Sequence, residues 1–292
     1  MNIRIIPRLD IKGPNLVKGI HFEGLRVLGK PEHFARYYYE QGADDLVYMD
    51  AVASLYGRNS LLDIIERTSR EIFIPLCVGG GLRSVADVQT VLRAGADKVH
   101  INTAAIERPE LIREIAQSFG SSTVVVSIEV IRQNGKMIAH TNYGRENTSI
   151  DAFEWAEQAV DLGAGELIVT SIDQEGTGKG YDLELTRRIA ESVSVPVIAG
   201  GGAGHTDHVI EVIEKGKADA VSLASLLHYN VVFSRDYDEG SFEAEGNIEF
   251  LQGRRGERLF TKIEETSLPE IKQALLEKGI PCREQVAIRR GR

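Results

Sequence analysis

The sequence predicts an α/β fold in which eight parallel strands alternate with helices and close into a barrel. Eight short runs rich in valine and isoleucine follow one another along the chain, and amphipathic helical segments separate most of them. Runs without strict polar alternation are typical of strands buried on both faces, as in a parallel sheet. Since barrels of this kind take roughly 200–250 residues as one domain, the 292 residues favour one (β/α)8, or TIM, barrel over 1–292.

The expected strands are the eight apolar runs, which occupy residues 3–10, 45–52, 73–81, 98–105, 123–130, 166–173, 195–202 and 218–225. Segments such as PEHFARYYYEQGA and DAFEWAEQAVDLGA supply the helices between them. The stretch 12–30 is too long for an average connection in such a fold, and we expect a lid or binding loop there. Residues 231–266 are polar and interrupted by glycines, so we expect an insertion there between strand 8 and the last helix, with a hairpin as one possible form. It would lie on the active-site face, where a lid or specificity element and a surface decoration are both open.

The second half of the chain repeats the first. GADDLVYMD at 42–50 resembles GAGELIVTS at 163–171, and IPLCVGGGLRS at 74–84 resembles VPVIAGGGAGH at 195–205, with the same spacing in both pairs. A third pair, GADKV and KADAV, is offset by one residue more. Ordered motifs at one spacing indicate that the barrel consists of two repeated half-barrels.

Composition excludes several classes of partner. The chain has 43 acidic and 34 basic residues, a net charge of −9, which argues against nucleic acid or an anionic membrane as the main partner. Only two cysteines occur, far apart, and no metal-ligand spacing is present. Without an apolar run long enough to span a membrane or a signal-like start, we expect a reduced, cytoplasmic protein that needs no metal and no cofactor.

Each half contains a strand that ends in three glycines, Gly79–Gly81 and Gly200–Gly202. Glycine lets backbone N–H groups approach an anion closely, and a following helix N-terminus adds a favourable dipole. The next strand in each half ends in small residues, Asn102 with Thr103 and Ala224 with Ser225. Tight turns alone would explain one such motif, but two copies predict two phosphate sites on opposite sides of one barrel mouth.

Two carboxylates end equivalent strands. Asp10 ends strand 1 and Glu129 ends strand 5, so both should face the mouth, where barrel active sites lie. Opposed carboxylates suit a general acid and a general base, and the alternative is that each only caps a neighbouring turn. Asp50, Asp173 and Glu175 follow nearby, and for the first two we favour a structural role.

Charged residues recur at the opposite, N-terminal ends of four strands: Arg4, Asp45, Lys98 and Glu166. Two of each sign predict a ring of salt bridges that closes the bottom of the barrel. A purely stabilising role is the alternative, because this face of a barrel is usually structural.

Segments in all eight units resemble the cyclase subunit of imidazole glycerol phosphate synthase. They include RIIPRLDIKGPNLVKG, VGGGLRSVADV, GADKVHINTAA, TSIDQEGTGKGYD and IAGGGAG. The resemblance covers about residues 1–230 and resumes near 267–282. It implies that a glutaminase (HisH-type) partner at the N-terminal face releases ammonia, which crosses the barrel and reacts with a ribulosyl nucleotide that carries two phosphates. The implied products are imidazole glycerol phosphate and aminoimidazole carboxamide ribotide, in histidine biosynthesis.

The resemblance also implies residue roles. Asp10 and Glu129 would be the catalytic carboxylates. Residues that would bind substrate are Lys18, Gly81, Asn102, Thr103, Thr170, Gly176, Gly202, Ala224 and Ser225. The ammonia gate would consist of Arg4, Asp45, Lys98 and Glu166.

The chain departs from the family pattern at several of these positions. Glu129 and Glu175 stand where the family has aspartate, and Asp45 stands where it has glutamate. Arg8 replaces a small residue or cysteine, on the same strand face as Asp10. Arg8 would therefore pair with Asp10, lower its pKa and stop it acting as an acid.

These departures leave two other functions open. In one, a divergent paralogue delivers ammonia for the amidation of a surface-polysaccharide sugar. In the other, the chain is a scaffold that binds a partner subunit and catalyses nothing. The gate residues favour ammonia handling over a scaffold, and the two phosphate sites favour the cyclase over sugar amidation.

Overall fold

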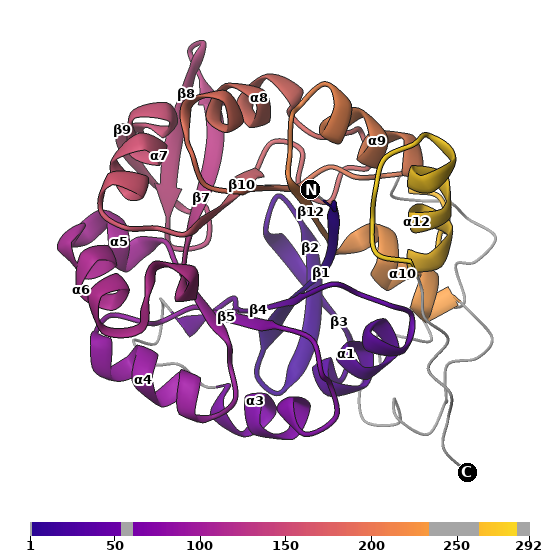
Figure 1. Cartoon of the computed structure of the whole chain (residues 1–292), viewed down its shortest axis with the longest axis horizontal. Coiled ribbons are helices and arrows are strands. Elements are labelled where there is room, and N and C mark those ends of the chain that lie inside the picture. Colours follow the sequence, from indigo (N-terminus) through magenta and orange to yellow (C-terminus); the bar gives the residue numbers. More distant parts are fainter. Residues whose placement is uncertain (1, 54–60, 234–262, 285–292) are drawn as a thin grey trace.

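The computed structural model describes residues 2–53, 61–233 and 263–284, and its parallel strands close into the barrel of Figure 1. Each strand pairs in parallel with the next, and the pairings of β12 with β1 and of β7 with β10 complete the circle. The barrel strands are β1 (Arg4–Lys12), β4 (Leu46–Asp50), β5 (Leu76–Gly79), β6 (Lys98–Ile101), β7 (Val124–Gln133), β10 (Glu166–Ser171), β11 (Val197–Gly200) and β12 (Ala220–Leu223). The predicted (β/α)8 barrel is thereby confirmed.

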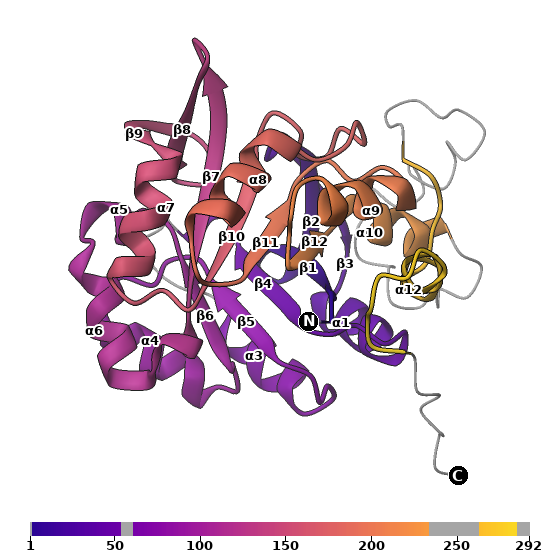
Figure 2. The ribbon, with the colours of Figure 1, turned by 45° about the horizontal axis from the view of Figure 1, so that its top comes forward.

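Helices surround the strands on the outside, as Figures 1 and 2 show. They are α1 (Pro31–Glu40), α3 (Leu62–Ser69), α4 (Val85–Arg93), α5 (Thr103–Glu107), α6 (Glu110–Phe119), α7 (Ala152–Asp161), α8 (Leu183–Ser192), α9 (Thr206–Glu214), α10 (Ser225–Phe233) and α12 (Leu268–Glu277), with a short 3-10 turn, η1 (Ser121–Thr123). Their starts follow the sequence: the Asp151 side chain caps α7, and the Asp182 side chain caps α8. Helices such as α6 pack an apolar stripe on the sheet, which in α6 consists of Leu111, Ile112 and Ile115.

The side chains inside the barrel form layers along its axis. Charged residues occupy the N-terminal ends of the strands, as described below. Above them lies an apolar layer with one side chain from each of seven strands: Ile6, Val47, Cys77, Val125, Ile168, Ile198 and Ala220. Polar and charged side chains follow at the C-terminal ends, where the mouth opens.

The aspartate that ends the two Gly-Ala-Asp segments and the Lys-Ala-Asp segment has a structural task. Asp44, Asp97 and Asp219 each precede a strand, and each accepts a hydrogen bond from the backbone of a neighbouring strand, at 2.8–2.9 Å. The paired GAD and GAG segments lead into β4 and β10, which are the second and sixth strands of the circle. Equivalent motifs of the two halves therefore lie on opposite sides of the barrel.

Two hairpins extend the barrel at its C-terminal end. The stretch 12–30, expected as a loop, instead forms β2 (Asn15–Ile20) and β3 (Glu23–Gly29), which continue β1 antiparallel. The second hairpin continues β7 into β8 (Lys136–Thr141) and β9 (Glu146–Asp151). Asn134 and Gly135 form its tight turn, both with positive φ, and this Asn-Gly pair is a strong hairpin signal.

The segment 231–266 lies mostly outside the described residues, and so does the hairpin expected within it. Its first three residues belong to α10, where Val231 and Val232 are buried in the core. The last helix, α12, starts with a capping box between Ser267 and Glu270. No helix in the described ranges has the length and apolar character that crossing a membrane requires.

Candidate active site at the barrel mouth

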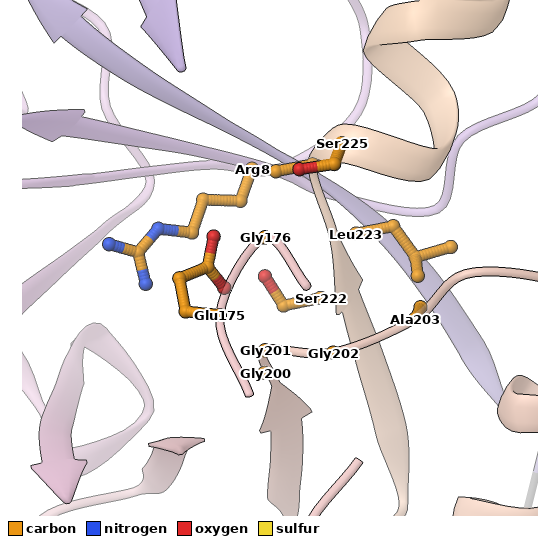
Figure 3. A pocket seen from close by; sticks show the side chains of 11 residues that line it. Arg8, Glu175, Gly176, Gly200, Gly201, Gly202, Ala203, Ser222, Leu223 and Ser225 are labelled. Carbon is orange, nitrogen blue, oxygen red and sulfur yellow. The ribbon is translucent and has the colours of Figure 1, made fainter. Parts of the chain in front are cut away.

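Two pockets open at the mouth, one in each half of the barrel. Residues from β4 to β6 line the first pocket, including Gly81, Asn102 and Thr103. Residues from β10 to β12 and their loops line the second, including the predicted Gly176, Gly202, Ala224 and Ser225. Figure 3 shows the second pocket, in which the backbone of the glycines runs along one edge and the Ser225 side chain lies opposite. The structure thus gathers the predicted phosphate-binding residues into two separate groups.

Glycine is required where these pockets form. Gly81 has a φ of 72° and Gly202 a φ of 114°, a left-handed region that other residues avoid. A Cβ atom at Gly202 would collide with the carbonyl oxygen of Gly180. The two loops therefore pass close to each other only because the side chain is absent, and the backbone of the glycine-rich turn borders the pocket.

Asp10 is buried at the end of β1 between two cations. The Arg8 Nε donates to its Oδ1 at 2.9 Å, and the Lys18 Nζ lies 3.9 Å from its Oδ2. Burial by itself would raise the pKa of Asp10, but the two positive charges outweigh burial and lower it. Asp10 is therefore ionised at neutral pH, as expected from the position of Arg8.

Glu129 lies on β7 and is completely buried. Among the described residues, neither of its carboxylate oxygens has a partner in good hydrogen-bond geometry, although the Asn102 side chain and the Gly144 backbone lie close enough to lower its pKa. Burial raises its pKa to about 7, although Arg8 acts to lower it. The two predicted catalytic carboxyls thus differ: Asp10 is paired and ionised, and Glu129 is unpaired and able to hold a proton near neutral pH.

Lys18 is buried on β2 and forms an ion pair with Glu175. Burial would lower its pKa, but Glu175 and Asp10 together raise it, so the ammonium form persists. Thr170 on β10 accepts a hydrogen bond from Arg8 at 3.4 Å. Lys18 and Thr170 therefore meet the two carboxylates at the centre of the mouth, between the pockets.

The two hairpins meet over this centre. The rings of Phe22 and Tyr143 pack at 4.2 Å between centroids, and the Arg8 guanidinium lies 5.1 Å from the centre of the Phe22 ring. The second hairpin is attached to the first pocket, because Asn102 donates to the His140 carbonyl and Thr103 accepts from the Asn142 backbone. The two buried rings therefore form an aromatic cover beside Arg8.

Sequence reasoning missed Phe22, Tyr143 and His100. His100 lies on β6 against Gly79, and burial lowers its pKa to about 4, so the ring is neutral. The Asn-Gly turn would have revealed the second hairpin, but no local pattern shows that its far end meets Phe22. The expected backbone roles of Asp50 and Asp173 do appear, since they accept from the backbone of Val52 and Arg132.

At the other end of the barrel the four predicted charges form one closed ring. Arg4 lies 2.7 Å from Asp45 and 3.2 Å from Glu166, and Lys98 lies 3.5 Å and 2.9 Å from the same two carboxylates. Each cation thus contacts both anions. In the part of the chain that the structure describes, no group of three or more His, Cys, Asp or Glu side chains could hold a metal ion.

A family model described as "Histidine biosynthesis protein" matches residues 4–232 of this chain. The chain belongs to this family. A relative from Legionella pneumophila, named "Imidazole glycerol phosphate synthase subunit HisF", is 58% identical over 204 residues, which are 70% of this chain and 96% of the relative. Two relatives of the same name from Bacillus cereus strains G9842 and Q1 are 51% and 50% identical over 227 residues, 77% of this chain and 90% of each relative. The family membership agrees with the resemblance seen in the sequence, and the relatives are named as subunits.

Proposed function

We propose that this chain is the cyclase subunit of imidazole glycerol phosphate synthase. It would combine ammonia with a ribulosyl nucleotide that carries a phosphate at each end, and release imidazole glycerol phosphate and aminoimidazole carboxamide ribotide. The observation that carries the proposal is the pair of glycine-lined pockets on opposite sides of the mouth, with two buried carboxyls between them. The names of the relatives support the same activity.

The geometry divides the work among a few groups. Backbone N–H groups and small polar side chains in each pocket would hold one phosphate, and so fix the ends of the substrate. The reacting centre would then lie between the pockets, beside Asp10 and Glu129. The aromatic cover of Phe22 and Tyr143 would keep water away from that centre, and would have to open for a long substrate to enter.

A glutaminase subunit of the HisH type is the partner that we propose for the N-terminal face. Ammonia released there would meet the ring of Arg4, Asp45, Lys98 and Glu166, which would act as a gate. Beyond the ring, the apolar layer of the barrel would carry the uncharged molecule toward the mouth. Each cation of the ring contacts both anions, so a change in one member should alter how the ring opens toward the barrel interior.

The alternatives fit less well. The three relatives are named as subunits of the synthase, and their names give no support to sugar amidation. A scaffold without activity does not explain Glu129, because a buried carboxyl without a partner costs stability and is a mark of functional sites.

One assay tests the proposal without any partner. Purified chain is mixed with the ribulosyl nucleotide and an ammonium salt at alkaline pH, where free ammonia is plentiful, and both products are followed by chromatography. Loss of substrate with formation of the imidazole product is the expected result. Intact substrate, with the chain folded and both pockets able to bind phosphate, would overturn the proposal.

A further inference from the structure

We propose that Arg8 is a positioning residue that gives the two carboxyls of the mouth different tasks. It holds Asp10 as a permanent carboxylate and leaves Glu129 as the one carboxyl that gives and takes the proton. The inference deepens the cyclase function proposed above and rests on it.

The contacts of Arg8 hold its side chain in one place. Its Nε donates to Asp10 at 2.9 Å, a terminal nitrogen reaches Thr170 at 3.4 Å, and the guanidinium lies over the Phe22 ring. The Arg8 carbonyl is also fixed, because it lies 2.9 Å from Nε2 of His228. Figure 3 shows the side chain extending across the mouth toward Glu175.

His228 adds no charge to this arrangement. Its Nε2 must donate to the Arg8 carbonyl, so its Nδ1 accepts from the Tyr38 hydroxyl at 2.6 Å. Both bonds suit the neutral ring, and burial lowers the pKa of His228 to about 3. The charges that act directly on Asp10 are therefore those of Arg8 and Lys18.

Glu129 has a different set of neighbours. Arg8 and Asp10 act on it from β1 with opposite sign, and Asn102 and the Gly144 backbone act to lower its pKa. His140 is its register partner on β8, but the His140 Nδ1 faces the Ile138 carbonyl. Tyr143 is buried and keeps its proton, because burial raises its pKa well above the ordinary value.

Charge balance leads to the same assignment. We define the mouth cluster as Arg8, Lys18, Asp10, Glu175 and Glu129. The two cations are matched by Asp10 and Glu175, through the contacts given above. A third ionised carboxylate would leave a net negative charge in a buried site, which is costly. The cluster is neutral when Glu129 holds a proton.

The cause of the division is the position of the cation. When two carboxyls occupy one buried site without a cation, they hold one proton between them. The two observed pKa values then describe the pair and not either residue. Arg8 is bonded to one carboxyl only, so it breaks this symmetry in favour of an ionised Asp10. A proton carrier works best when its pKa is near the working pH, and in this cluster Glu129 meets that condition.

The first experiment measures protonation directly and needs no activity. Infrared spectra of the whole chain are recorded from pH 5 to 9, and the C=O band of a protonated carboxyl is assigned by difference with Glu129→Gln and Asp10→Asn. The expected result is one band that titrates near pH 7 and disappears in Glu129→Gln. A band that disappears instead in Asp10→Asn would overturn the inference.

The second experiment follows cyclase rate against pH at a fixed concentration of free ammonia. The wild-type chain should show one titration near pH 7 in kcat. In Arg8→Met the pKa of Asp10 should rise by about one unit or more, so a second titration should appear in the pH profile. Arg8→Lys keeps a cation beside Asp10 and should show the single titration of the wild-type chain. Arg132→Met removes an exposed arginine that pairs with Asp182 and Glu184 at the same end of the barrel and should leave the profile unchanged.

The outcomes separate the inference from the proposed function. A uniform fall in kcat for Arg8→Met, with the pH profile and the infrared titration unchanged, would show a merely structural role and overturn the inference. If Arg8→Met does not fold, the infrared titration of the wild-type chain and the Arg8→Lys profile still decide. A wild-type chain without cyclase activity would refute the proposed function, whereas the infrared titration would still test what Arg8 does to the two carboxyls.

Discussion

Charged side chains meet across the barrel axis at both ends of this molecule, but the two sets are built differently. At the N-terminal end, two cations face two anions, and each cation contacts both anions. At the mouth, two cations face three carboxyls, and Glu129 forms no ion pair within the described part of the chain. In the ring, every charged side chain has partners of opposite sign, so the ring can close this end of the barrel. The mouth cluster has one carboxyl more than it has cations. This extra carboxyl, Glu129, can bind and release a proton.

The largest effect expected from this difference is on catalysis. Glu129→Gln should lower the ammonia-dependent cyclase rate by about 10²–10⁴-fold, because the amide cannot exchange a proton. Steady-state kinetics with ammonium salt measure this. Glu184→Gln, which alters an exposed carboxyl at the same barrel end, is the matched control and should retain the rate. A Glu129→Gln enzyme of undiminished activity would move the proton transfer to another carboxyl.

The second effect is on stability and its pH dependence. The pKa of Glu129 is raised from 4.5 to about 7, so its contribution to stability is present below pH 4.5 and lost as the pH rises through 7. The full loss is about 3 kcal/mol. Urea unfolding at pH 5 and pH 8.5 should therefore show Glu129→Gln gaining stability relative to the wild-type chain at the higher pH. A difference independent of pH would mean that Glu129 is ionised throughout.

A smaller effect concerns anion binding, which should occur at the mouth and not at the ring. Crystals soaked in sulfate should show one anion near Gly81 and Asn102 and another near Gly202 and Ser225. Ser225→Ala removes one hydrogen bond to a charged group, about 1.5 kcal/mol, or roughly tenfold in affinity at the second site. The first site serves as the internal reference. Empty pockets at high sulfate concentration, with the mouth open, would contradict the assignment of both phosphate sites.

The smallest effect on the activity of the isolated chain is expected at the ring. Lys98→Ala leaves two largely buried carboxylates that share Arg4 alone, so stability should fall by roughly 1–3 kcal/mol because a net negative charge remains there. Ammonia-dependent turnover should be spared. With a glutaminase partner present, glutamine-dependent turnover should fall, because the gate no longer couples the two reactions. Equal losses in both assays would show that the ring is only structural.

The eight strands, the helices between them and the twofold repeat all follow from the sequence. Hydrophobic periodicity and turn residues specify secondary structure over a few positions of the chain. Eight alternating strands and helices then bury their apolar faces when the strands close into a parallel barrel. The four ring charges and the two glycine-rich pockets were also predicted. Their positions depend only on where a strand starts or ends.

Contacts between distant loops could not be predicted in the same way. The residues 12–30 form a strand pair where a loop was expected, because β2 finds its partner in the extended end of β1. The cover of Phe22 and Tyr143 joins two hairpins that are far apart in the chain. No pattern in either segment shows which side chain of the other it will meet.

The sequence by itself determined the barrel, its two halves and the residues at each strand end, because these depend on spacing and side-chain alternation. It also placed Arg8 beside Asp10 on one face of β1. Only the tertiary structure decided that Glu129 would be buried without a partner while Lys18 paired with Glu175. Protonation depends on desolvation and on every charge within a few ångströms, and those neighbours come from strands that only the closed barrel brings together.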